Sequence, residues 1–462
     1  MRLTIQTLSH EIRARRVSPA ELTRECLAAI EKLNPELNAF ITVLAESALE
    51  EARRAEQEIF RGKYRGPLHG IPVGLKDLID TAGTRTTAAS ALFKDRVPSE
   101  DAEVVRRLRA GGAVILGKQN LHEFGYGASS LISYYGEVRN PWNTTRIAGG
   151  SSGGSAASVA AGLGYAAIGT DTAGSIRLPA AYCGVVGIKP TYGRISTQGV
   201  IPLAWSYDHV GTITRTVCDG ALALQVLAGH ETGDKTTADI PIADYTCDLD
   251  EQLPPLRVGI PREFFFDDLD AEVAAAVENA IQTLREMGCE IRDEIKLDVS
   301  TDRTLSNAES WAYHKKFVAR SPELYQPATL TRIRAGENIS EADVERAKRE
   351  LTAMRDSFQK VFEEVDVLLT PTAPIPPPPI AELKDNPGQL RPAELIMLRN
   401  TRPFNVWGIP ALSLPCGFTK DGMPIGLQLA GAPWVPDKGL HLAYQYEQAT
   451  EWHKRVPSPI SS

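Results

Sequence analysis

Two serine-bearing glycine loops constrain this chain more than any other feature. The first runs from Gly149 to Ser155 and the second from Thr170 to Arg177. Glycine leaves room for close backbone approach and reaches positive φ at little cost. The residues between the loops, 156–169, are mostly small, which favours tight packing of this stretch. The pattern therefore predicts a site where backbone lies close to backbone or to a ligand.

The composition of the chain is that of an ordinary globular protein, with 43% hydrophobic and 23% charged residues. The formal net charge of −8 argues against nucleic acid or an anionic membrane as the main partner. No apolar run is long enough to cross a bilayer, and the N-terminus lacks the apolar core of a signal peptide. The six cysteines have no paired spacing, which predicts reduced thiols. We therefore expect a cytoplasmic protein.

Helices and buried strands are expected to alternate along the chain. Apolar segments typical of strands lie at 71–75, 113–116, 166–169, 185–188, 257–260, 365–369, 411–414 and 425–429. Helical patterns or caps lie at 19–33, 45–60, 101–110, 155–163, 219–227, 271–287 and 346–363. The first of these helices is expected to end at Asn34–Pro35. A helix followed by an apolar strand implies a sheet with helices on its faces, so we predict an α/β fold.

Lys76 is the first candidate for catalysis, because it lies in the apolar segment Gly70–Asp77. Burial disfavours the charged form of lysine, so its pKa would fall and the neutral amine could accept a proton. The alternative is a lysine paired with Asp77 or Asp80 beside a loop. Together with the serine loops, the catalytic interpretation is favoured.

The first glycine loop matches the pattern G-x-S-x-G twice, centred on Ser151 and on Ser152. A nucleophile elbow of the α/β-hydrolase type is one interpretation, and it requires an acid and a histidine later in the chain. The available histidines stand at positions His209, His230, His441 and His453, none in a distinctive motif. A phosphate-binding loop is not indicated, because the Lys-Ser/Thr ending of that motif is absent. The other interpretation is a glycine turn with a purely structural role.

The second loop supplies candidate donors for an oxyanion. Four consecutive backbone N–H groups could converge on one oxygen, those of Thr172, Ala173, Gly174 and Ser175. Such donors stabilise a tetrahedral intermediate, and losing one costs about 10²–10³ in rate. Ser175 would then be the attacking group, and Arg177 is expected to brace the loop through Asp171.

Other motifs are weaker. Ser357 and Lys360 match S-x-x-K on a charged helix, but the partner motifs of penicillin-recognising enzymes are missing. No histidine or cysteine spacing predicts a metal site, and no cofactor is expected.

The chain resembles the amidase signature family. The resemblance is carried by the two serine loops, by Gly74–Asp77, and by Gly187–Thr191, Asp208–Arg215, Pro410–Pro415 and Pro424–Gln428. It covers nearly the whole chain and is least specific from about 300 to 399. It implies a single domain over 1–462 with a mixed central sheet covered by helices on both faces. Within it, about 1–65 would be helical, about 66–230 the catalytic core, and about 300–400 a variable helical pocket region.

The resemblance also implies a triad of Lys76 as base, Ser151 after a cis peptide bond as proton relay, and Ser175 as nucleophile. An acyl-enzyme on Ser175 would then be hydrolysed by water. One departure is Ala173, which stands where many members have glycine. Alanine keeps its N–H but prefers negative φ, so the oxyanion hole should persist with a slightly different loop shape.

We therefore expect a hydrolase of carbon–nitrogen amide bonds, including aryl amides or carbamates, with some esterase activity. The predicted partner is a small-molecule amide or carbamate, with no nucleic acid and no membrane, for a monomer or homodimer. The predicted substrate contacts are Gly125, Tyr126, Gly127, Ala128 and Trp205.

Two alternatives stay open. One is the glutaminase subunit of a tRNA-dependent amidotransferase; such subunits usually carry a Phe-Asp-Gly stretch that is absent from 301–399. The other is a non-catalytic scaffold that keeps the fold.

Overall fold

The centre of the molecule is one mixed β-sheet. The computed structural model describes residues 3–458 except 247–248, 250, 252–253 and 435–437. Within these residues the sheet has eleven strands in the order β1-β3-β2-β6-β8-β7-β12-β13-β11-β9-β10. Their bounds are β1 Phe40–Val43, β2 Pro72–Lys76, β3 Val114–Gln119, β6 Ala166–Asp171, β7 Val186–Lys189, β8 His209–Thr214, β9 Arg257–Gly259, β10 Glu290–Arg292, β11 Val367–Pro371, β12 Ala411–Phe418 and β13 Pro424–Gly431. A separate pair is formed by β4 Arg139–Asn140 and β5 Asn143–Ile147.

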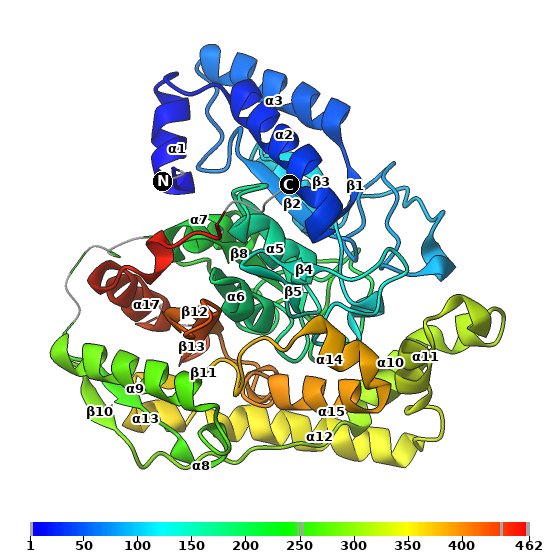
Figure 1. Ribbon diagram of the computed structural model, residues 1–462, viewed down its shortest axis with the longest axis vertical. Helices are drawn as coiled ribbons and strands as arrows, with labels where there is room; N and C mark the ends of the chain where they lie inside the picture. The colour runs from blue at the N-terminus through cyan, green and yellow to red at the C-terminus, as the bar shows by residue number, and fades with distance from the viewer. Residues whose placement is uncertain (1–2, 247–248, 250, 252–253, 435–437, 459–462) are drawn as a thin grey trace.

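Helices surround this sheet (Figure 1). They are α1 Ile5–Arg13, α2 Pro19–Leu37, α3 Ala45–Phe60, α4 Glu103–Ala110, α5 Gly153–Ala160, α6 Arg177–Cys183, α7 Val217–Leu227, α8 Arg262–Phe265, α9 Ala271–Glu286, α10 Thr304–Val318, α11 Pro327–Arg334, α12 Glu341–Phe358, α13 Val361–Glu364, α14 Ile380–Asp385, α15 Pro387–Met397, α16 Pro403–Val406 and α17 Lys438–Ala449.

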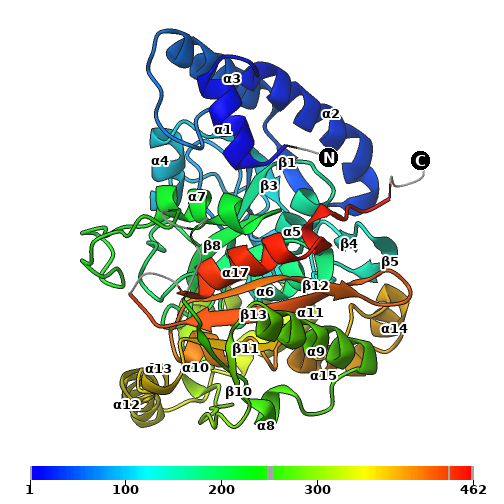
Figure 2. The same cartoon turned by 90° about the vertical axis from the view of Figure 1, so that its left-hand side faces the viewer.

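Both faces of the sheet are covered. Helices α5 and α6 pack on one face, against β2, β6, β7, β12 and β13. Helices α7, α9 and α17 cover the other face, and α9 and α17 lie in front of β12 and β13 in Figure 2. Because strands buried on both faces must be apolar throughout, they read as continuous apolar runs in the sequence. The predicted α/β fold with a mixed, doubly covered sheet is confirmed.

Parallel pairing places the ends of two strands side by side at the site. Strand β2 pairs in parallel with both β3 and β6, with Leu75 opposite Ile168. Strand β6 then pairs antiparallel with β8. The carboxyl ends of β2 and β6 therefore meet, and these ends carry Lys76 and Thr170.

Small residues let α5 lie close to the sheet. Every residue of this helix is buried. A Cβ on Gly154 would lie 2.4 Å from the carbonyl oxygen of Asn120 and 2.5 Å from that of Ala39. Only glycine fits there, which accounts for part of the first glycine loop.

Helix α2 differs from the prediction at its end. Ser18 caps its N-terminus by accepting a hydrogen bond from the Glu21 amide, as the capping pattern predicts. The helix continues through Pro35 to Leu37 and ends at Asn38, which has φ 52°. Proline removes only one helical hydrogen bond in the final turn, so the helix does not stop at Asn34–Pro35.

The remaining sequence predictions concern cysteines and membranes. Five cysteines are free thiols in the described part of the chain: Cys26, Cys183, Cys218, Cys289 and Cys416. Cys247 lies outside the described residues. No described helix is long and apolar enough to cross a membrane.

Candidate active site

Lys76 lies at the end of β2, fully buried. Its Nζ is 2.7 Å from Ser151 Oγ and 2.7 Å from Thr170 Oγ1. Burial lowers the pKa of Lys76 to about 7, although the charges of Asp171 and Asp208 oppose the shift. A lysine with this pKa exchanges its proton near neutral pH, so it can act as a base.

The aspartates considered as partners of Lys76 are engaged elsewhere. Asp77 lies 3.5 Å from the buried Lys118 and accepts hydrogen bonds from Thr87. Asp80 forms a bidentate ion pair with Arg96 at 2.6 and 2.7 Å. The lysine that neutralises an acid beside this loop is therefore Lys118.

The first glycine loop is held against the second by its backbone. The peptide bond between Gly150 and Ser151 is cis. The Ser152 amide donates to the carbonyl oxygen of Ser175 over 3.1 Å, and Ser152 Oγ donates to the carbonyl of Thr170 over 3.2 Å. These contacts hold the loop of Ser151 against the loop of Ser175, and Lys76 contacts Ser151 from the end of β2.

Asp171 and Arg177 brace the second loop, as the sequence predicts. Both side chains are fully buried and form an ion pair at 3.0 Å. Asp171 also accepts hydrogen bonds from the amides of Gly174, at 2.7 Å, and Ile176, at 3.2 Å. Burial alone would raise the pKa of Asp171, but the Arg177 guanidinium holds that pKa well below its usual range.

The predicted role of the Gly174 amide in the oxyanion hole is corrected by the structure. We predicted four amides, Thr172 to Ser175, facing one oxyanion, but the Gly174 N–H already donates to Asp171. Thr172, Ala173 and Ser175 line the pocket, and Gly174 does not. The Asx-type turn consumes this amide, which a residue pattern alone does not reveal.

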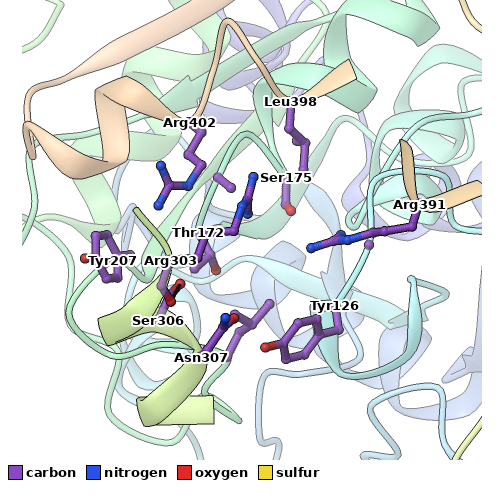
Figure 3. A pocket seen from close by; sticks show the side chains of 14 residues that line it. Tyr126, Thr172, Ser175, Tyr207, Arg303, Ser306, Asn307, Arg391, Leu398 and Arg402 are labelled. Carbon is purple, nitrogen blue, oxygen red and sulfur yellow. Dashed lines mark hydrogen bonds between the residues drawn. The ribbon is translucent and has the colours of Figure 1, made fainter. Parts of the chain in front are cut away.

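A pocket opens over Ser175 (Figure 3). Its lining combines the catalytic loop with segments from distant parts of the chain: Gly125, Tyr126, Gly127, Thr172, Ala173, Ser175, Leu203, Tyr207, Arg303, Ser306, Asn307, Arg391, Leu398 and Arg402. Three of the predicted substrate contacts, Gly125, Tyr126 and Gly127, are therefore found here.

Two predicted contacts lie elsewhere. Ala128 is fully buried, does not line this pocket, and donates its amide to the carboxylate of Glu394 over 3.1 Å. Trp205 is 42% exposed and lines an adjoining pocket with Gly125, Thr172 and Asp208. Their places follow from tertiary packing that short segments do not encode.

The pocket arginines were not singled out from the sequence. Arg303 precedes α10, Arg391 lies within α15, and Arg402 precedes α16. All three come from beyond residue 300, where the resemblance is least specific, and no local motif marks them. Only their common position in the pocket distinguishes them from surface arginines.

The histidine-dependent alternative is not supported by the geometry. His209 is buried and places Nδ1 2.6 Å from the carbonyl oxygen of Tyr207. His230 contacts Thr237, and His441 contacts the carbonyl of Glu251. The backbone amide of His122 donates to the carbonyl oxygen of Ser151 over 3.1 Å, but among the described residues no histidine ring is hydrogen-bonded to Ser151, Ser152 or Ser175.

The S-x-x-K match of Ser357 and Lys360 lies exposed at the end of α12. Ser357 Oγ donates to the carbonyl of Met354 in its own helix and is exposed, which is typical of a solvated helix face. In the described part of the chain, no group of three or more His, Cys, Asp or Glu side chains has the arrangement of a metal site.

Comparisons with known proteins identify the family of the chain. The Amidase family matches residues 21–438. The chain is 41% identical to a glutamyl-tRNA(Gln) amidotransferase subunit from Geotalea daltonii, over 98% of both chains. It resembles the structure of 6-aminohexanoate cyclic dimer hydrolase complexed with substrate, with a TM-score of 0.89 and 32% identity over 98% of each chain. A structure of a vestigial protein complex, described as revealing the origins of an s-triazine catabolic enzyme, has a TM-score of 0.89 and 33% identity, covering 96% of this chain and 98% of that one.

These relatives correct the predicted partners. We predicted a small-molecule substrate with no nucleic acid, for a monomer or homodimer. The curated relatives are subunits of amidotransferases named for glutamyl-tRNA(Gln), over nearly their full length. We had used the net charge of −8 to argue against a nucleic-acid partner. That argument fails for a subunit, because the charge of one chain does not predict what the whole complex binds. The family match, the sheet and its helices together show that the chain belongs to the amidase signature family and is a hydrolase acting on carbon–nitrogen bonds.

Proposed function

We propose that this chain hydrolyses a carboxamide through an acyl-enzyme on Ser175, with Ser151 as proton relay and Lys76 as base. The observation that carries the proposal is the buried contact of 2.7 Å between Lys76 Nζ and Ser151 Oγ. A neutral amine and a hydroxyl at this distance can exchange a proton directly. Ser175 lines the adjoining pocket, where a carbonyl carbon can reach it (Figure 3).

The steps conserve protons. Neutral Lys76 takes a proton from Ser151 Oγ, which takes one from Ser175 Oγ as this oxygen attacks the amide carbon. The carbonyl oxygen becomes an anion, and we assign its stabilisation to the amides of Thr172, Ala173 and Ser175, which line the pocket. Ser151 then returns a proton to the leaving nitrogen, and the C–N bond breaks. Water, deprotonated by the same relay, attacks the ester, and the carboxylic acid and free Ser175 are released.

We further propose that the chain works as the ammonia-releasing subunit of an amidotransferase. This setting is supported by curated relatives of 37–41% identity that span 98% or more of this chain and carry that name. It is the glutaminase alternative raised from the sequence, and it is better supported than a stand-alone amidase. The absence of Phe-Asp-Gly from 301–399 shows that the pocket region differs from the usual pattern of such subunits.

The reaction is tested with Ser175→Ala and a fluorophosphonate probe. We expect the wild-type chain to be labelled at Ser175 and to release ammonia from a carboxamide, and the variant to do neither. Ser155→Ala is the matched control, because Ser155 Oγ is buried at the start of α5, on the neighbouring glycine loop, with no hydrogen-bond partner among the described residues. Turnover retained by Ser175→Ala would exclude the proposed nucleophile.

The amidotransferase setting is tested on the assembly purified from the native host, where we expect glutamyl-tRNA(Gln) to stimulate ammonia release. A chain that is fully active alone and insensitive to this tRNA would exclude the amidotransferase setting.

A further inference from the structure

Three arginines gather in the pocket over Ser175. Arg303, Arg391 and Arg402 come from three different segments and reach the pocket from different sides (Figure 3). Tyr126, Ser306 and Asn307 add neutral polar groups to the same lining. The described residues that line this pocket include no aspartate or glutamate. The pocket is therefore cationic beside the nucleophile.

Carboxylates nearby do not neutralise this charge. Among the described residues, Arg303 has no ion pair. Arg402 donates to two backbone carbonyls, those of Ser300 and Asp302. Arg391 lies 3.8 Å from Glu394, and that carboxylate is already 2.8 Å from Arg332.

The arginines also disfavour each other's charge. Burial and the charge of Arg402 lower the pKa of Arg303 to about 10. Burial, with Arg332 and Arg303, lowers the pKa of Arg391 to about 10. Both side chains stay charged at pH 7, because their pKa values remain well above it. A partly buried set of cations without acids is costly until an anion occupies it.

We infer that Arg303, Arg391 and Arg402 bind a carboxylate of the substrate, so that the substrate class is an amide bearing a carboxylate, and an ammonium group close to that carboxylate is not required. The inference rests on the proposed amide hydrolysis at Ser175. A guanidinium is suited to this task, since its planar donors match a carboxylate with two parallel hydrogen bonds. The α-ammonium group of glutamine finds no acid in this lining, so the des-amino analogue should be accepted at least as well.

Three amides of equal chain length separate these charges. Glutaramate carries the carboxylate alone, glutamine carries the carboxylate and an ammonium group, and pentanamide carries neither. We expect kcat/KM for glutaramate to exceed that for pentanamide by about 100-fold, since a site built for a polar group rejects the analogue lacking it. We expect glutaramate to be used at least as well as glutamine.

Variants connect this preference to the pocket. Arg303→Met is the sharpest, because Arg303 has no ion pair among the described residues and its removal leaves no buried acid unpaired. We expect it to lower kcat/KM for glutaramate by about 10-fold or more and to lower kcat/KM for pentanamide by much less, with partial recovery for glutaramate in Arg303→Lys. The exposed Arg320→Met, after α10, is the control and should change neither.

A binding measurement keeps the inference testable without turnover. The dianion glutarate should protect Ser175 of the wild-type chain from the fluorophosphonate probe, and Arg303→Met should lose this protection. Equal use of glutaramate and pentanamide, or an equal loss on both in Arg303→Met, would overturn the inference while Ser175 labelling leaves the proposed reaction standing. Absence of both turnover and glutarate protection would also overturn it. Failure of Ser175 to label would instead count against the proposed reaction.

Discussion

At the scale of single residues, Lys76 shows how burial creates a base. Its ammonium form is disfavoured because the side chain has left water, and the hydroxyls of Ser151 and Thr170 are neutral partners. Lys118, one strand away and equally buried, instead lies 3.5 Å from a carboxylate. Two buried lysines of adjacent strands therefore have different roles, set by the presence or absence of an acid.

The pH dependence of the reaction should report Lys76. Because its pKa is lowered to about 7, Lys76 is protonated and inactive below this pH and neutral above it. We expect kcat/KM to rise about tenfold per pH unit below 7 and to level off above it. Lys76→Arg should lose about 10²–10⁴ in kcat/KM, because arginine stays charged, whereas exposed Lys63→Arg should not. A flat profile between pH 5.5 and 8 would contradict this role.

Some residues of the candidate site could be singled out from the sequence, and others could not. Ser151 and Ser175 could be singled out as candidates because each lies in a contiguous loop of small residues that carries the family resemblance. Arg391 and Arg402 could not, because they reach the pocket only after residues more than two hundred positions apart have packed together. Local patterns reveal the chemistry of the site, and tertiary packing decides what the site binds.

At the scale of elements, α17 is joined to α7 through a buried carboxylate. Glu447 on α17 accepts the amide of Val217, the first residue of α7, over 2.9 Å. Burial raises the pKa of Glu447 to about 8, and the nearby Asp219 adds to the shift. The folded protein therefore keeps this carboxyl protonated at neutral pH.

This carboxyl should make stability fall as pH rises. Between pH 4.5 and 8 the unfolded chain loses a proton that the folded chain retains, so unfolding becomes easier across this window. Glu447→Gln keeps an acceptor for Val217 without a charge. We expect it to exceed the wild type in free energy of unfolding by about 4 kcal/mol at pH 8, with the gain shrinking toward pH 4.5.

Urea denaturation at pH 5, 6.5 and 8 measures this difference. Glu451→Gln is the control, because Glu451 is exposed just beyond the same helix and should show no gain that grows with pH. An equal advantage of Glu447→Gln at pH 5 and pH 8 would contradict the assigned protonation.

Helices with a clear apolar periodicity agree with the prediction. Strands that depend on pairing with distant strands were not predicted. Helices α3 and α9 follow the predicted ranges closely because their apolar faces repeat at helical spacing. Strands β1 and β8 were not predicted; β1 is short and β8 is polar at both ends, and each is held by pairing with partners distant in sequence. Helix α2 passes through Pro35 because the proline falls in its last turns.

At the scale of the whole molecule, the sheet joins segments in an order unrelated to the chain. Strand β2 lies between β3 and β6, and β7 lies between β8 and β12. Apolar patterns predict that strands exist and that the sheet is buried, which was enough for the α/β class. The strand order depends on non-local pairing, for which a single sequence carries no local signal.

Arg177 joins two halves of this sheet beside Ser175: the half that contains β6 and the half that contains β13. Besides Asp171, it donates to the carbonyl oxygen of Thr401 over 2.8 Å, to Gln428 over 2.7 Å and to Asn405 over 2.6 Å. Its contacts thus connect the loop before α6 with α16 and β13. The position of Ser175 depends on this network, because the same loop carries it.

We therefore expect Arg177→Met to lower both stability and activity. It leaves the carboxylate of Asp171 buried without its ion pair, which costs about 3–5 kcal/mol in free energy of unfolding. Fluorophosphonate labelling of Ser175 should slow in the folded variant, and Asp171→Asn combined with Arg177→Met should recover part of the stability. The surface pair of Arg146 and Asp421 provides the control, since Arg146→Met should cost no more than about 1 kcal/mol. If Arg177→Met unfolded at the wild-type denaturant concentration and labelled at the wild-type rate, the two halves of the sheet would not be coupled through this residue.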